Sequence, residues 1–155
     1  MANLFPEHDG FFWGDEAAAA EAETAAIAFG RGWRFDYGAG EFVVTPGGRI
    51  ASADAREAWV QWCEKAIRTP RYRHVIYSSD YGSELEDLIG SGYAHAVVES
   101  EIERMVTEAL LADRRTGSVD RFSFAWDGDR CTLTCYVTSV QEDVEILESE
   151  VMGIG

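Results

Sequence analysis

The clearest pattern of apolar positions along the chain is that of an amphipathic helix over residues 55–67. Ser52 or Asp54 can cap its N-terminus, and Pro70 ends it. The apolar side chains recur at the spacing of one helix face, and they are Ala55, Ala58, Trp59, Trp62, Cys63, Ala66 and Ile67. Large aromatic side chains on such a stripe are typical core anchors, so we expect Trp59 and Trp62 to be buried.

A second apolar stripe predicts a longer helix from about residue 93 to residue 113. Its face consists of Val98, Ile102, Met105, Val106, Ala109 and Leu110. Between the two helices, residues 74–77 predict a short strand. Ser83 and Glu86 have the spacing of a capping box, which predicts a short helix that ends at Gly90.

Two regions of alternating residues predict β-structure. Residues 33–37 alternate large apolar with charged side chains, residues 38–40 turn the chain, and residues 42–44 form a second strand. Near the C-terminus, Asp127-Gly128 indicates a two-residue type I′ turn. This turn pairs Trp126 with Asp129, Phe124 with Cys131 and Phe122 with Leu133. In this register one face of the hairpin is apolar and consists of Phe122, Phe124, Trp126, Cys131, Leu133, Cys135 and Val137.

These elements predict a small single α+β domain, with two main helices packed on antiparallel hairpin strands. The length of 155 residues suits one domain with a real core. No apolar run approaches the ~20 residues that span a bilayer. The N-terminus lacks the pattern of a secretory signal, so we expect the protein to stay in a reducing cytoplasm. The net charge of −15 argues against binding to nucleic acid.

Acidic residues are concentrated at the two ends of the chain. Residues 1–32 hold six acids and one arginine, and residues 141–155 hold five acids and no base. We therefore divide the chain into an acidic N-terminal arm (1–32), an α+β domain (33–140) and an acidic C-terminal arm (141–155). The N-terminal arm favours a helix around residues 17–23 that is marginal by itself, and its charge is interpreted as a solubility feature.

The C-terminal arm has two interpretations. Residues 143–148 alternate acidic and apolar side chains, as a strand with one apolar face does. Such a segment is either a strand that pairs with a neighbouring subunit or a frayed tail. On either interpretation we expect it to supply few core contacts, so that the domain folds without it.

The sequence offers little material for catalysis. Cys131 and Cys135 are too far apart along a strand for a disulfide, and no histidine lies at zinc-ligand spacing. Asp80 and Glu84 are the best candidates for the two carboxylates of a glycosidase. We interpret them instead as a turn residue and a residue of a helical first turn. We expect no enzymatic activity, no cofactor and no metal.

Three segments in fixed order resemble one family. The helix break at Thr69-Pro70 leads to Arg71 and Arg73, the corner Asp80-Tyr81-Gly82 opens into a helical turn, and an acidic helix leads into the hairpin of residues 119–137. This order resembles the sheath-initiator or small baseplate-wedge proteins of contractile phage tails, a baseplate family that has carried lysozyme-like labels, and within it the XkdS type. The resemblance covers about residues 33–140.

The resemblance implies assembly rather than chemistry. It implies a structural protein of the tail baseplate of a phage or phage-tail-like particle, made in the bacterial host cytoplasm and present in six copies. Its implied partners are the tail sheath protein and the baseplate wedge proteins, with the tail tube or hub as a further option. Where relatives carry Glu-Pro-Arg in contact with the wedge, this chain has Ala112-Asp113-Arg114-Arg115, without the proline.

Candidate interface residues follow from these motifs. They are Arg71, Arg73, Asp80, Tyr81, Arg114, Arg115, Val144, Ile146 and Leu147. The last three lie in the segment that is expected to pair with a neighbouring sheath or wedge subunit. Because sheath subunits exchange strands, the initiator is expected to offer a strand edge. A peptidoglycan-cleaving glycosidase and an intracellular adaptor unrelated to phages are the alternative functions.

Overall fold

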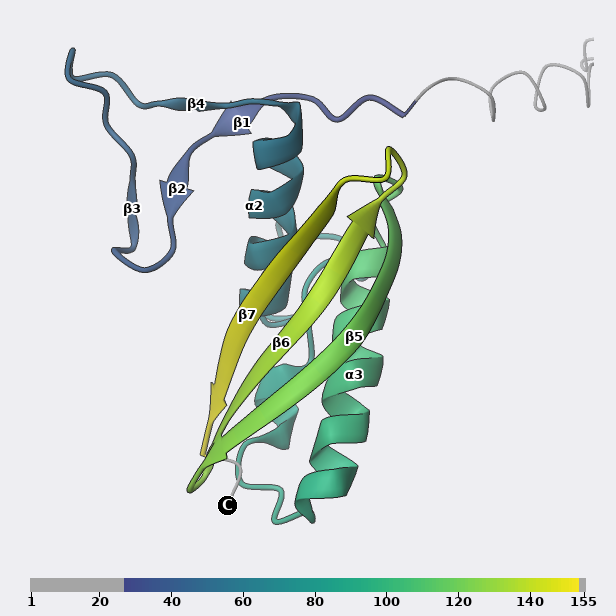
Figure 1. Ribbon diagram of the computed structural model, residues 1–155. Helices are drawn as coiled ribbons and strands as arrows, with labels where there is room; N and C mark the ends of the chain where they lie inside the picture. Colours follow the sequence, from purple (N-terminus) through teal and green to yellow (C-terminus); the bar gives the residue numbers. More distant parts are fainter. Residues whose placement is uncertain (1–26, 154–155) are drawn as a thin grey trace, which may run out of the picture.

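The computed structural model describes residues 27–153 as a sheet with two helices on one of its faces (Figure 1). The helices are α2 (Ala55–Arg68) and α3 (His95–Leu111). The sheet is antiparallel, in the order β5-β6-β7, and consists of β5 (Thr116–Asp127), β6 (Arg130–Ser139) and β7 (Val144–Met152). The expected small α+β domain with two main helices on antiparallel strands is confirmed.

The two helices form as their apolar stripes predict. Asp54 caps α2 through a capping box with Glu57, in which each side chain bonds the other residue's backbone N–H. Trp59 is fully buried, and its Nε1 donates to the Thr116 Oγ1 at 3.1 Å. The six residues of the α3 stripe are all buried. These contacts fix both helices against the sheet.

Trp62 departs from the prediction that it is a core anchor. It lies at the margin of the α2 stripe, is only partly buried, and packs edge-on against Tyr81 with ring centroids 5.6 Å apart. The apolar stripe of α2 is wider than the sheet face that it covers, so only part of the stripe is buried. Trp62 therefore belongs to the surface beside the core.

The hairpin register differs from the predicted one by one residue on each strand. Asp127 pairs with Arg130 and Trp126 pairs with Cys131, so Gly128 and Asp129 form the turn. Of these two, only Gly128 has a positive φ (62°), the pattern of a type II′ turn rather than type I′. The two shifts preserve the alternation, so the predicted apolar face is still the face that packs on the helices.

A β-bulge in β5 aligns a longer apolar face than the sequence predicted. Between the pairs Asp120–Tyr136 and Ser123–Thr134, β5 has one residue more than β6, and Arg121 takes a φ of 54°. The extra residue reverses the alternation. As a result, Val119 before the bulge and Phe122 after it both pack against the core.

The C-terminal segment is the third strand of the sheet. β7 pairs with β6 without a register shift from Val144–Thr138 to Met152–Arg130. Leu147 and Val151 are 3% and 5% exposed and belong to the core. The segment is thus neither a frayed tail nor peripheral, and the expectation that it supplies few core contacts is wrong. Sequence periodicity missed this because the predicted alternation followed Val144 and Ile146, whereas the buried residues Leu147 and Val151 lie on the other face of the strand.

The N-terminal strands form a projecting β-structure (Figure 1). β1 (Gly32–Trp33) pairs with β4 (Ser52–Ala53), and β2 (Phe35–Asp36) pairs with β3 (Glu41–Phe42) around the expected turn. Phe29 precedes these strands and is buried edge-on against Trp59. The helix predicted around residues 17–23 lies outside the described residues.

The connection between the two helices contradicts two predictions. Residues 74–77 form turns instead of a strand. The short helix η1 (Leu85–Leu88) is a 3₁₀ helix that Glu84 precedes without a side-chain cap. The Ser83 hydroxyl donates instead to the Ile67 carbonyl at 2.6 Å, so Ser83 ties this connection to the end of α2.

Gly82 is required at the corner of this connection. Its φ is 99°, and a Cβ added there would lie 2.6 Å from the Thr69 carbonyl oxygen. This close approach lets the Ser83 N–H donate to that same carbonyl and the Arg71 N–H donate to the Ser83 carbonyl. The corner is therefore held to the helix end by backbone pairing.

Candidate assembly interfaces

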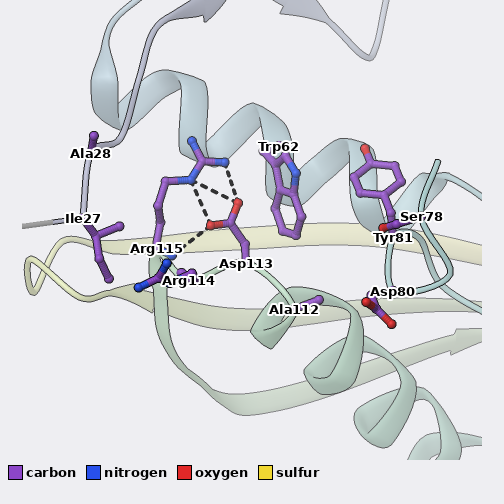
Figure 2. A pocket seen from close by; sticks show the side chains of 10 residues that line it. All are labelled: Ile27, Ala28, Trp62, Ser78, Asp80, Tyr81, Ala112, Asp113, Arg114 and Arg115. Carbon is purple, nitrogen blue, oxygen red and sulfur yellow. Dashed lines mark hydrogen bonds and ion pairs between the residues drawn. The ribbon is translucent and has the colours of Figure 1, made fainter. Parts of the chain in front are cut away.

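Four of the predicted interface residues line one open cavity, with a volume of about 620 Å³ (Figure 2). Asp80 and Tyr81 come from the corner after α2, whereas Arg114 and Arg115 follow α3. The remaining lining residues are Ile27, Ala28, Trp62, Ser78, Ala112 and Asp113. Two motifs that lie more than thirty residues apart in the sequence therefore share one surface.

The two arginines at this cavity have different environments. The Arg115 guanidinium binds Asp113 through both carboxylate oxygens and donates to the Phe29 carbonyl at 2.8 Å (Figure 2). Arg114 is exposed and has no ion pair with any residue between 27 and 153. Arg115 therefore holds the chain together locally, and Arg114 is the cation that a partner can reach.

Tyr81 gives the cavity an aromatic wall. Its ring packs against Trp62 and lies 4.5 Å from the Tyr77 ring. Burial raises the pKa of the Tyr81 hydroxyl to about 12, so this group stays protonated at neutral pH. Asp80 is exposed next to Tyr81, on the side of the cavity away from Arg114 and Arg115 (Figure 2). The lining thus combines an aromatic wall with two acids, Asp80 and the paired Asp113, and with the exposed cation Arg114.

Arg71 and Arg73 also differ in accessibility. The Arg71 side chain is 6% exposed, donates from Nε to the Gly82 carbonyl at 3.1 Å, and pairs with Glu84 and Glu108. The hydrogen bond from Arg71 and its charge lower the pKa of the Glu108 carboxyl. Arg73 is exposed and lies 3.4 Å from Glu86. Only Arg73 is available for an interface, because Arg71 is an internal tie between the corner and α3.

The outer edge of β7 carries unpaired backbone groups. The Ser139 N–H donates to the Asp143 carbonyl, whereas the Val144 carbonyl points away from β6 and accepts from Arg56 Nη2 at 3.1 Å. Because the direction alternates along a strand, Ile146, Glu148 and Glu150 direct their N–H and C=O groups outward. No strand or hydrogen-bond donor from residues 27–153 satisfies these groups.

The predicted interface residues of the C-terminal segment lie on opposite faces of β7. Val144 and Ile146 are 50% and 57% exposed on the outer face of the sheet. Leu147 points to the other face and is buried in the core, so it is not available to a partner in this conformation. The correction follows from the alternation, since Ile146 and Leu147 are neighbours in one strand.

A second cavity of about 760 Å³ runs beside this edge of β7. On one side it is lined by β7, and on the other by the end of α2, the corner and η1. Its lining residues are Ile67, Arg68, Pro70, Ser83, Leu85, Glu86, Ile89, Glu148, Ser149, Glu150 and Val151. It shares no residue with the cavity around Asp80 and Arg114, so the chain has two separate candidate surfaces.

Sequence reasoning missed two exposed apolar segments. Val75 and Ile76 are 104% and 86% exposed at the tip of the loop after α2. Trp33 and Phe42 are exposed on the projecting N-terminal strands. A short apolar run such as residues 75–77 is typical of a strand, so only its position between the turns identifies it as surface.

The carboxylates considered for glycosidase chemistry do not share the cavity. Asp80 lines it, whereas Glu84 pairs with Arg71 and is not among its lining residues. In the described part of the chain, no cluster of three or more His, Cys, Asp or Glu side chains is arranged to hold a metal ion. No helix among the described residues is long and apolar enough to cross a membrane.

Comparisons with known proteins agree with the resemblance in the sequence motifs. A family model described as contractile injection system sheath initiator matches residues 31–143. The phage-like element PBSX protein XkdS of Bacillus subtilis (strain 168) is 29% identical over 136 residues, which cover 86% of this chain and 89% of that protein. The family match ends just before β7, so it includes both candidate surfaces except β7 itself and the lining residues Ile27 and Ala28.

Proposed function

The chain belongs to the contractile injection system sheath initiator family, and on this basis we propose that it links the baseplate wedge to the first sheath ring and starts sheath assembly. Membership makes it a structural component of a contractile tail. In the proposed role, six copies of the chain lie in the tail baseplate, which is assembled in the host cytoplasm. The tail sheath and the wedge are the two partners, and no catalytic role is assigned.

The observation that carries the proposal is the regular outer edge of β7, with which no strand of residues 27–153 pairs. A sheath initiator of this kind needs a preformed edge onto which the first sheath subunit can add a strand. Ile146, Glu148 and Glu150 direct their backbone N–H and C=O groups toward that edge. The acidic side chains of β7 keep such an edge soluble before the partner arrives. The strand is held in place by the core contacts of Leu147 and Val151.

The cavity around Asp80, Tyr81 and Arg114 is the proposed contact with the wedge. It is separate from the β7 edge, so both partners can bind at the same time. Where the family resemblance implies a Glu-Pro-Arg triplet, this chain has Ala112-Asp113-Arg114-Arg115. The Arg115–Asp113 pair fixes the loop here by other means, leaving Arg114 exposed to the partner.

A proline at Glu148 tests the sheath contact. It removes one outward N–H and leaves the pairing with β6 intact, since proline is tolerated at the solvent side of an edge strand. In the complete tail-gene cluster, Glu148→Pro particles should show baseplates without sheath by electron microscopy. Glu148→Ala keeps the backbone N–H and should still form sheaths, and Ala55→Pro, a proline at a first helical position, should assemble normally. Full-length sheaths on Glu148→Pro baseplates would overturn the proposal.

A charge reversal at Arg114 tests the wedge contact. Arg114→Glu should reduce the amount of this chain in purified baseplates, as measured by quantitative mass spectrometry. Arg49→Glu makes the same charge change at an exposed residue outside both cavities and serves as the control. Equal incorporation of both variants would show that the cavity does not bind the wedge.

A further inference from the structure

We propose that the β7 edge selects an extended partner segment in which aliphatic side chains alternate with lysine or arginine. This inference rests on the proposed function, because it assumes that the edge accepts a strand. It goes further by specifying the side-chain chemistry of that strand. The selection comes from two surfaces that meet at the edge, the cavity beside β7 and the carboxylates of β7.

The cavity specifies the inward side chains of the added strand. A strand next to β7 directs every second side chain to the face of the sheet that packs on the helices. On that side it meets the cavity between β7 and the corner, where Ile67, Leu85 and Val151 provide an apolar floor. Ile89 is half exposed there and would be covered. Aliphatic side chains fit this surface, because charged ones would lose water without a partner.

The carboxylates of β7 specify the outward side chains. Glu148 and Glu150 lie on the opposite face of the sheet and are exposed. Glu150 is 3.8 Å from Arg130, and Glu148 has no ion pair within residues 27–153. Glu86, which pairs with Arg73 at 3.4 Å, adds a third carboxylate at the rim of the cavity, whose lining contains one cation, Arg68. Side chains opposite each other on adjacent strands are close neighbours, so lysine or arginine is favoured beside these acids.

The same charges disfavour the two strands that this protein itself could add to the edge. If a second copy of the chain added its own β7 to this edge, glutamates would lie beside glutamates, and like charges on adjacent strands repel. Residues 1–26 of the chain contain six acids and no lysine or arginine, so they are also poorly matched. The charge pattern therefore points to a segment of a different subunit.

The position of Arg56 limits where the strand can pair. Its guanidinium donates a hydrogen bond to the Val144 carbonyl and another to the Glu145 carboxylate, the latter at 2.6 Å. The vacant part of the edge thus runs from Ile146 to Glu150. A strand of about five residues covers this length, which is the usual length of a strand in globular proteins.

Binding of defined peptides to the full-length protein tests the inference. One peptide alternates valine with lysine, a second alternates valine with glutamate, and a third has the lysine composition in two blocks. Affinity is measured by fluorescence anisotropy, and the location of binding by hydrogen exchange of the Ile146, Glu148 and Glu150 amides. We expect the alternating lysine peptide to bind at least about fivefold tighter than the glutamate peptide at low salt, with protection of these amides.

Variants separate selection by β7 from attraction to an acidic protein. The double variant Glu148→Lys/Glu150→Lys should reverse the preference between the two alternating peptides. Glu41→Lys/Glu103→Lys changes the net charge equally at exposed residues elsewhere and should keep the original preference. Glu148→Pro should abolish binding of both peptides to the edge.

Each outcome bears on one of the two proposals. Equal affinity of the lysine and glutamate peptides, with Glu148→Pro still blocking both, would overturn the charge selection and leave strand addition standing. Binding of the lysine peptide that persists in Glu148→Pro, or binding of the block peptide with equal affinity, would show nonspecific attraction and overturn the inference. Failure of every peptide to protect the edge, together with sheaths on Glu148→Pro baseplates, would overturn both.

Discussion

The two edges of the three-stranded sheet differ in how they manage their unpaired backbone. β5 forms one edge and carries two register shifts, one at Gly117 and one at Arg121, where the backbone adopts a positive φ. β7 forms the other edge and pairs with β6 over nine residues without a shift. A bulge twists an edge strand and interrupts the row of backbone groups that another strand would need.

The difference indicates which edge is meant for a partner. Ordinary proteins protect an exposed edge because it promotes aggregation. On β5 the bulges provide that protection, whereas β7 relies on the charge of its side chains and keeps a regular register with β6. A regular edge protected only by charge is still able to accept a strand of opposite charge. Substitutions that compare the two edges, or the two sides of β7, are expected to have effects that decrease from the core of β7 to the end of its free edge.

The largest effect is expected from the buried side of β7. Leu147→Ala should destabilise the protein by about 2–5 kcal/mol, because it opens a cavity in the core. Ile146→Ala, at the exposed neighbouring position, should cost about 0.5 kcal/mol or less. Urea denaturation followed by tryptophan fluorescence measures both. Equal effects would show that β7 does not pack as a core strand.

Proline scanning should distinguish the inner from the outer edge of β7. Ser149→Pro removes an N–H that bonds to β6 and should cost about 2–3 kcal/mol, since a carbonyl of β6 is left unpaired. Glu148→Pro should cost about 1 kcal/mol or less, because its N–H points outward. Thermal unfolding by circular dichroism measures the pair. The opposite ranking would reverse the assignment of the free edge.

The bulge in β5 predicts a smaller effect that depends on the side chain. Arg121→Val should be less stable than Arg121→Gly by about 1–2 kcal/mol, because a β-branched residue fits poorly at a φ of 54°. Both variants lose the contact of Arg121 with the Tyr136 ring, so that loss cancels in the comparison. If the two variants have equal stability in urea, Arg121 does not hold the bulge in this conformation.

The smallest effect is expected at the end of the free edge. Arg56→Ala removes an exposed contact and should cost only about 0.2–1 kcal/mol of stability. It also frees the Val144 carbonyl, so we expect the alternating lysine peptide to bind about twofold tighter. Arg49→Ala is the matched control. Unchanged or weaker binding would place the end of the usable edge elsewhere than at Arg56.

The candidate interfaces were only partly accessible to sequence reasoning. The motifs around Asp80 and Arg114 were identified, and the structure brings them to one cavity. Their neighbours Arg71 and Arg115 carry the same charge in the sequence but serve as internal ties. Nothing local separates a buried arginine from an exposed one, because the difference depends on acids distant in the sequence, such as Glu108 for Arg71.

By itself, the sequence determined the two helices, the apolar face of the hairpin and the family. The helices and the hairpin face depend on spacing within one segment, which a period of 3.6 or 2 residues records directly. The family followed from the order of three motifs along the chain. Only the tertiary structure decided that residues 144–152 complete the sheet, where the hairpin turns, and which edge stays open. Strand pairing joins segments through backbone groups that every residue has, so the side-chain pattern of one strand does not specify its partner. For this chain, the free edge is a property of the folded sheet.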